Sequence, residues 1–178
     1  MSADESAETS QIVVRRGGAQ DVRFLRDMLH HAYYWKERAP EDTGPGPVAL
    51  YVKAWGRPGD AAMIAIDAGF PVGAAWYRLF ARDRRGYGFV DERTPELAIA
   101  VVPNARGKGV GAALLEALLD RARAEGYEAI SLSVDRNNAG AIGLYERHGF
   151  ERVGEEDDSV TMLAHLEQTP TTEGTDTG

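Results

Sequence analysis

The stretch from Glu96 to Gly111 constrains the fold of this chain more than any other. It begins with a nearly continuous apolar run, which is typical of a central strand, and continues through a short bend that carries Arg106. A glycine-rich turn, R-G-K-G-V-G, then leads directly into a helical pattern that starts at Val110. At the start of this helix we expect unpaired backbone N–H groups, the positive end of the helix dipole and two cationic side chains. Together they predict a phosphate-binding site.

Three kinds of phosphate site fit parts of this turn. A P-loop requires Ser or Thr after its lysine, whereas Lys108 is followed by Gly109. A dinucleotide-binding turn fits G-x-G-x-x-A at residues 107–112 and has Asp135 downstream. However, four residues separate this turn from its strand, and Asp135 lies further away than the usual ~20 residues. The third kind of site depends on a second motif.

That second motif lies about thirty residues further on and reads N-x-x-A-x-x-L-Y-x-x-x-G-F, from Asn138 to Phe150. Together, the two motifs resemble the GNAT superfamily of acyl-CoA-dependent N-acetyltransferases. The family's Q/R-x-x-G-x-G/A motif matches residues 106–111. The resemblance is strong from Glu96 to Phe150 and looser over residues 12–95, where only the order of elements agrees.

The resemblance implies an α/β (α+β) fold: a GNAT-like mixed, mostly antiparallel central sheet with a parallel central strand pair and helices on both faces. Hydrophobic periodicity predicts compatible elements. A single domain is expected over residues 11–167, between polar, acidic tails at residues 1–10 and 168–178 that are expected to be disordered. Strands are predicted at residues 12–16, 61–67, 72–80, 97–102, 129–134, 150–154 and 159–166, and helices at 19–34, 48–55, 110–125 and 139–148.

Charge and composition exclude several other classes of function. The net charge is -8, but five of the 28 acidic residues lie in the tails and a sixth, Glu167, directly precedes the second tail; the remaining 22 face 20 basic residues. Such a nearly neutral body does not favour nucleic-acid binding. The absence of cysteine excludes a thiolate nucleophile, and the histidines have no metal-ligand spacing, so no metal site is predicted. The polar N-terminus and the absence of a long apolar run predict a cytoplasmic protein without a membrane partner.

By resemblance, the cosubstrate is acetyl-CoA, and its pyrophosphate lies against the backbone of the glycine-rich turn. Small residues allow close approach of that backbone, and three glycines beside Arg and Lys exceed what a plain tight turn requires. The family also implies a bulged, splayed strand at Ala100–Val102, where the N–H of Val101 polarises the thioester carbonyl and stabilises the oxyanion. The implied cofactor-binding residues are Ala100, Val101, Val102, Arg106, Gly107, Lys108, Gly109, Val110, Gly111, Ala112, Asn138, Ala141 and Tyr145.

Two residues match positions where the family often has catalytic groups. Tyr145 would be the general acid near the CoA sulfur, since a phenol with a pKa of about 10 can protonate a departing thiolate. Glu96 would be the base that an alkylamine with a pKa near 10 needs, with Asp91 and Glu92 as substitutes. Ordinary roles stay open for both: core packing for Tyr145 and a surface carboxylate for Glu96. Asn138 is also expected to act as an N-cap.

The resemblance therefore implies an N-acetyltransferase that moves an acetyl group directly from acetyl-CoA to a primary amine of a small molecule or protein. An NAD(P)-type dinucleotide-binding protein and a CoA-binding module without catalysis stay open as alternatives. The acceptor is expected to contact Tyr34, Trp35 and Tyr77, because an aromatic cluster can hold an apolar or cationic substrate. The family includes monomers and dimers, so a homodimer also stays open.

Overall fold

The computed structural model describes residues 12–33 and 50–167. Its strands form one seven-stranded sheet in the order β1-β2-β3-β4-β5-β7-β6. The predicted tails and the segment between residues 34 and 49 lie outside the described residues. Neighbouring strands are antiparallel except for the central pair β4 and β5, which is parallel. The strands are β1 (Val13–Arg16), β2 (Ala61–Asp67), β3 (Phe70–Arg78), β4 (Glu96–Val101), β5 (Ala129–Asp135), β6 (Phe150–Glu156) and β7 (Ser159–His165).

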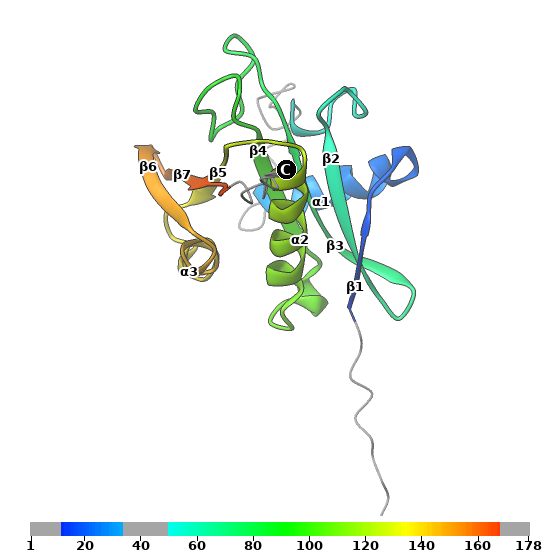
Figure 1. Cartoon of the computed structure of the whole chain (residues 1–178). Helices are drawn as coiled ribbons and strands as arrows, with labels where there is room; N and C mark the ends of the chain where they lie inside the picture. Colours follow the sequence, from blue (N-terminus) through cyan, green and yellow to red (C-terminus); the bar gives the residue numbers. More distant parts are fainter. Residues whose placement is uncertain (1–11, 34–49, 168–178) are drawn as a thin grey trace, which may run out of the picture.

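Helices cover both faces of this sheet, as Figure 1 shows with α2 in front of the sheet and α1 behind it. The helices are α1 (Val22–Tyr33), α2 (Val110–Ala124) and α3 (Ala139–Arg147). Leu114 and Leu118 of α2 are fully buried in one hydrophobic cluster, to which α3 also contributes. Leu25 of α1 is buried in a second cluster on the opposite face. The predicted fold class is therefore confirmed.

The ends of the helices follow from local backbone chemistry. α2 begins after Gly109 and ends just before Gly126, and both glycines have positive φ values, of 80° and 88°. The side chain of Asn138 accepts a hydrogen bond of 3.2 Å from the N–H of Ala141, which confirms the predicted N-cap of α3. None of the helices among the described residues is long and apolar enough to cross a membrane.

Several element boundaries differ from the sequence prediction by a few residues, and two of these differences concern the β2–β3 hairpin and the segment before β2. The hairpin of β2 and β3 closes through Ala68 and Gly69 alone, whose φ values of 49° and 84° suit a tight two-residue turn. β3 therefore begins at Phe70, two residues before the predicted start. Of the predicted helical piece at residues 48–55, the structure describes residues 50–55, in which Leu50 and Tyr51 are helical and residues 52–54 form a non-helical turn.

Candidate active site

The central parallel strands are paired at their beginnings and separate after that point. Among the described residues, the ladder between β4 and β5 consists of Glu96 opposite Ser131, where the N–H of Ser131 donates to the carbonyl of Pro95 at 3.0 Å. β4 continues to Val101 and β5 to Asp135 without further pairing. The predicted splay is therefore present. The gap opens toward the end of β4 that leads to the glycine-rich turn.

The expected bulge in β4 is not found in the described pairing of β3 and β4, whose register runs without a shift from Gly73–Val101 to Arg78–Glu96. That prediction was wrong because β3 holds β4 in regular antiparallel pairing, so the gap comes from divergence on the β5 side alone.

The regular register also shows where the N–H groups of β4 point. The N–H of Val102 donates to the carbonyl of Val72 at 2.9 Å, so even-numbered residues of β4 bond to β3. Ile99 and Val101 consequently direct their N–H groups into the gap. Arg106 donates through Nε to the carbonyl of Val101 at 3.2 Å and so caps the acceptor at the mouth of this gap. Ile99 was not among the predicted site residues, because its orientation depends on the strand register.

The glycine-rich turn leaves the start of α2 open. Gly107 and Gly109 have φ values of 77° and 80°, and an added Cβ at either position would meet no atom within 4 Å. Gly109 provides no side-chain cap, and its carbonyl accepts the helical bond from Ala113 at 3.1 Å. The N–H groups of residues 110–112 therefore have no intrahelical partner. Together with the exposed Lys108, this is an arrangement that can bind an anion.

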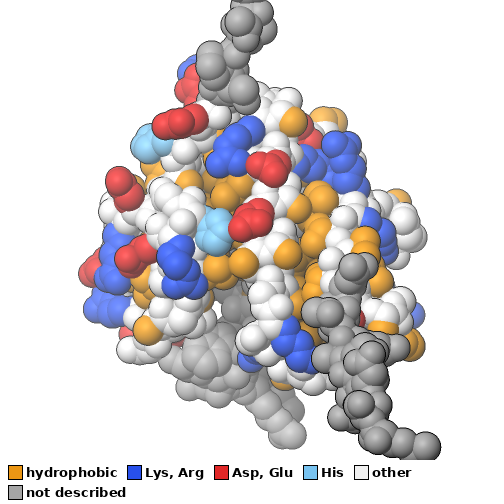
Figure 2. All heavy atoms as spheres, turned by 60° about the horizontal axis from the view of Figure 1, so that its bottom comes forward, with side chains coloured by type: hydrophobic (Ala, Val, Ile, Leu, Met, Phe, Trp, Pro, Cys, Tyr) orange, Lys and Arg blue, Asp and Glu red, His pale blue; other side chains and the backbone are white. Residues whose placement is uncertain are grey.

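The end of the molecule where α2 starts lies at the bottom of Figure 1 and comes forward in Figure 2. On the face drawn there, basic and acidic side chains are interspersed with hydrophobic ones. No single sign of charge dominates this face. The anion-binding character of the turn is therefore local and rests on the helix start with its adjacent cations.

α3 lies beside the start of α2, since a Cβ on Gly111 would sit 3.5 Å from Cδ2 of Leu144. Tyr145 is 6% exposed, and its ring packs edge-to-face on Phe150 at 5.7 Å between centroids. Its hydroxyl makes no hydrogen bond to any residue in the described ranges, which leaves it available to an external partner. Burial raises the pKa of Tyr145 well above 10, so the phenol keeps its proton at neutral pH.

Glu96 lies at the opposite end of β4 from the turn, on the face covered by α1. It has the same parity as Ala98 and Ala100, which pack in the α1 cluster. The carboxyl group accepts hydrogen bonds from the Tyr51 hydroxyl at Oε2 and from the Gly88 N–H at Oε1, the latter at 3.1 Å. Burial raises the pKa of Glu96 to about 8, partly opposed by the Gly88 N–H. Glu96 is thus a buried group with a pKa suited to a base, and not a surface carboxylate.

The loop between β3 and β4 covers this carboxyl group through two glycines. A Cβ on Gly86 would lie 2.5 Å from Oε1 of Glu96, and a Cβ on Gly88 would lie 2.5 Å from the backbone of Leu132 in β5. Ser131 donates through Oγ to the carbonyl of Gly88 at 2.8 Å and fixes the loop to β5. Glycine is needed at Gly88 because a side chain there would overlap the backbone of β5, whereas a side chain at Gly86 would require the ends of the Glu96 and Tyr51 side chains to shift.

Of the three predicted acceptor residues, the described structure includes Tyr77. Tyr34 and Trp35 lie outside the described residues. Tyr77 is fully buried on the α2 face, where its hydroxyl donates to Oε2 of Glu125 at 2.5 Å. Trp76 is buried on the opposite face, because successive side chains of a strand alternate. The structure therefore places Tyr77 in the core and not in an acceptor site.

Solved acetyltransferase structures have a similar fold. The crystal structure of a GNAT superfamily phosphinothricin acetyltransferase from Sinorhizobium meliloti, in complex with AcCoA, matches with a TM-score of 0.66 and 24% sequence identity. The match covers 92% of this chain and 94% of that chain. At this level of identity the likeness establishes the fold.

Curated relatives match more closely over shorter stretches. An L-methionine sulfoximine/L-methionine sulfone acetyltransferase from Pseudomonas paraeruginosa is 44% identical over 62 residues, which are 35% of this chain and 36% of that protein. A mycothiol acetyltransferase from Propionibacterium freudenreichii is 36% identical over 99 residues, 56% of this chain and 30% of that protein. The chain thus spans about a third of the length of these relatives. The family model described as Acetyltransferase (GNAT) family matches residues 24–150. Because this match takes in most of the 178 residues, the chain belongs to the GNAT family of acetyltransferases.

Proposed function

We propose that this protein is an N-acetyltransferase that moves an acetyl group directly from acetyl-CoA to a primary amine of a small molecule or protein. The observation that carries the proposal is the opening of the β4–β5 pair beyond Glu96 and Ser131, beside an uncapped start of α2. A gap between two strands can take an extended arm, while a helix start binds the phosphates at the end of that arm.

The residues of the chain fit acetyl-CoA at both ends of this gap. The N–H groups of residues 110–112 and the positive charges of Arg106 and Lys108 favour the pyrophosphate. The N–H groups of Ile99 and Val101 face the gap and can bind the pantetheine arm or polarise the thioester carbonyl. Acetyl-CoA supplies the activated acetyl thioester, and the chain supplies orientation and proton transfer.

Tyr145 is proposed as the general acid that protonates the departing CoA sulfur. Its position on α3 beside the start of α2, its unpaired hydroxyl and its raised pKa support this role, since a donor must hold its proton until the thiolate leaves.

Glu96 is proposed as the base that takes the amine proton. Ile99 lies three residues further along β4, about 10 Å at 3.3 Å per residue. The carboxyl group is covered as well. Glu96 therefore acts through intervening hydrogen-bonded groups and not by direct contact with the attacking amine.

The dinucleotide-binding alternative finds no support in this fold. A dinucleotide fold needs an open, mostly parallel sheet with helices wound on both faces. The described sheet contains one parallel pair among otherwise antiparallel neighbours. Thermal unfolding and thiol release distinguish a CoA-binding module without catalysis from the proposed enzyme.

Two measurements test the proposal. The first is thermal unfolding of the protein with acetyl-CoA, CoA or NADPH, because a ligand at 100 times its Kd adds about 2.7 kcal/mol of stability. The second is release of free CoA thiol from acetyl-CoA in the presence of L-methionine sulfone, phosphinothricin, spermidine or a peptide with a free N-terminus. We expect stabilisation by acetyl-CoA and CoA, and thiol release that depends on one class of amine.

The outcomes separate the three functions. Stabilisation by NADPH without any by acetyl-CoA would contradict the proposal. Stabilisation by acetyl-CoA with no amine-dependent thiol release over the whole set of amines would favour a CoA-binding module. As a matched control, Tyr145→Phe should bind acetyl-CoA as tightly as the unmodified protein while releasing thiol more slowly.

A further inference from the structure

The contact between Tyr51 and Glu96 joins residues 45 positions apart and is buried on both sides. We propose that Tyr51 is a positioning residue for Glu96, and that the buried Asp60–Arg78 ion pair holds Tyr51 in place. The inference rests on the proposed function, in which Glu96 is the base. Three sets of contacts support it: those of Arg78, those of the Tyr51 ring and backbone, and those of the Tyr51 hydroxyl.

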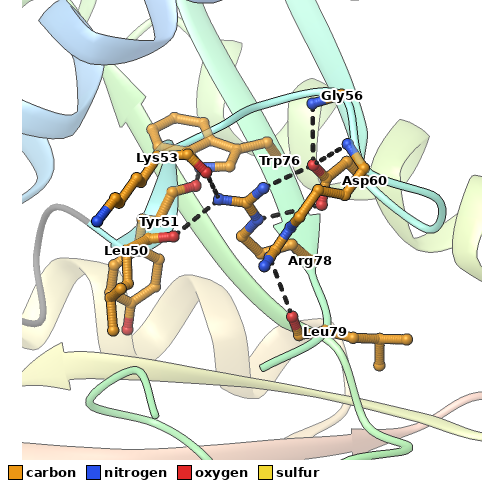
Figure 3. Close-up of polar contacts among 9 residues, drawn as sticks. Leu50, Tyr51, Lys53, Gly56, Asp60, Trp76, Arg78 and Leu79 are labelled. Carbon is orange, nitrogen blue, oxygen red and sulfur yellow. Dashed lines mark hydrogen bonds and ion pairs between the residues drawn. The ribbon is translucent and has the colours of Figure 1, made fainter. Parts of the chain in front are cut away.

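Arg78 ties the segment that carries Tyr51 to the end of β3. Its guanidinium donates to both carboxylate oxygens of Asp60, at 3.1 and 2.7 Å, with side-chain exposures of 1% and 3%. Nη1 also donates to the carbonyls of Leu50 and Lys53, each at 2.8 Å. Figure 3 shows Arg78 between these two carbonyls on one side and Asp60 on the other. The backbone on either side of Tyr51 is therefore held by one buried cation.

Two further contacts fix the Tyr51 residue itself. The indole Nε1 of Trp76 donates to the carbonyl of Tyr51 at 3.2 Å. The Tyr51 ring packs edge-to-face on Phe80, with 5.2 Å between centroids. With the adjacent carbonyls held by Arg78 and its ring enclosed, the side chain has little rotational freedom. These packing and hydrogen-bond contacts direct the Tyr51 hydroxyl toward Glu96.

The hydroxyl group is also oriented for donation. Its oxygen accepts a hydrogen bond of 3.0 Å from the N–H of Tyr87, and it lies against Oε2 of Glu96. With its oxygen accepting on the loop side, the phenolic proton is directed toward the carboxylate. A hydrogen bond donated to a carboxylate stabilises its ionised form. The Tyr51 contact therefore stabilises the carboxylate form of Glu96, which is the form that can accept a proton.

Within residues 12–33 and 50–167, few other ionisable groups face Glu96. Arg78 lies opposite Glu96 in the register of β3 and β4, but it is engaged with Asp60. The part of α1 packed on this side of the sheet presents apolar residues such as Leu25 and Met28, and Ser131 of β5 is uncharged. The Tyr51 hydroxyl and the Gly88 N–H are therefore the donors to Glu96 among the described residues.

Tyr51→Phe tests this role, and Tyr77→Phe is its matched control. Both variants remove the hydroxyl of a buried tyrosine that donates to a glutamate, but the Tyr77–Glu125 contact is only partly buried and lies on the α2 face of the sheet. Glu96 ionisation is read from the 13C NMR signal of its Cδ, assigned with Glu96→Gln. The pH dependence of kcat/KM is measured in parallel. Because hydrogen bonds to charged groups are strong, Tyr51→Phe should raise the Glu96 midpoint by about one to two pH units.

We expect the alkaline-rising limb of kcat/KM to move by the same amount in Tyr51→Phe and to stay in place in Tyr77→Phe. An unchanged NMR midpoint in folded Tyr51→Phe would overturn the inference. Should this variant not fold, the unmodified protein decides: the Cζ signal of Tyr51 and the Cδ signal of Glu96 should titrate with one midpoint, and separate midpoints would overturn it. Absence of acetyl transfer would contradict the proposed function alone, since the NMR midpoints still report whether Tyr51 sets the ionisation of Glu96.

Discussion

Replacing Arg78 with methionine should lower the free energy of unfolding far more than breaking an exposed ion pair does. Methionine keeps most of the length of the side chain but removes four hydrogen bonds, two to Asp60 and two to the carbonyls of Leu50 and Lys53. Asp60 is then left as a buried carboxylate without its counter-ion. The cation over the ring of Trp55, at 5.3 Å, is lost as well.

The expected loss follows from what stays buried. Removing one partner of a buried ion pair typically costs about 3–5 kcal/mol, because the remaining charge is uncompensated. Asp60 still accepts the N–H groups of Gly56 and Arg57, at 3.1 and 2.9 Å, which limits the loss. We therefore expect Arg78→Met to lose about 3–5 kcal/mol of unfolding free energy. Adding Asp60→Asn should recover part of this loss, since the amide keeps an acceptor for those N–H groups without the charge.

Urea unfolding measures this loss, with Arg123→Met as the control. Arg123 pairs with Asp120 on the surface of α2, with side-chain exposures of 38% and 78%, so its removal should cost about 1 kcal/mol or less. Midpoints are compared at constant m value, so that a change reflects stability. A loss for Arg78→Met within about 1 kcal/mol of that for Arg123→Met would refute the reasoning.

Three further predictions concern the site. Gly109→Ala and Gly126→Ala should each lose about 1 kcal/mol of stability, because both positions have positive φ, but only Gly109→Ala should weaken acetyl-CoA binding in a calorimetric titration. Tyr145→Phe should lower kcat about 100-fold or more with little change in the KM for acetyl-CoA or in urea midpoint, and an unaltered kcat would remove Tyr145 from the chemistry. The raised pKa of Glu96, about 8 against 4.5, means that the folded protein holds this proton more tightly than the unfolded chain between these pH values. Its contribution to stability is therefore lost as the pH rises through this window, and Glu96→Gln should lose less stability between pH 5 and pH 9 than the unmodified protein.

Local patterns were enough to predict most elements of the fold. The start of α2 at Val110 and the cap at Asn138 follow from glycine and N-cap chemistry that acts within a few residues. The position of Phe70 was mispredicted because the two-residue turn before it contains Ala68, and alanine rarely adopts positive φ. The residues of this turn therefore did not indicate the tight two-residue turn that forms there.

The site was less accessible to sequence reasoning, because it depends on pairings between distant residues. Alternation places Trp76 and Tyr77 on opposite faces, but it does not say which face is which, or that both are buried. Ile99 was missed because the direction of its N–H depends on the register with β3. Tyr51 and Glu96 meet only once the loop, the sheet and the Asp60–Arg78 pair are all in place.

The most direct test of the proposed acetyl-CoA site is to follow backbone amide signals by NMR as acetyl-CoA is added. The account predicts that the largest shifts fall on Ile99 and Val101 in the gap and on residues 109–112 at the start of α2. NADPH at the same concentration should leave these signals unmoved. Shifts from acetyl-CoA that fall elsewhere, with the signals of β4 and the α2 start unchanged, would contradict the assignment of this gap as the acetyl-CoA site.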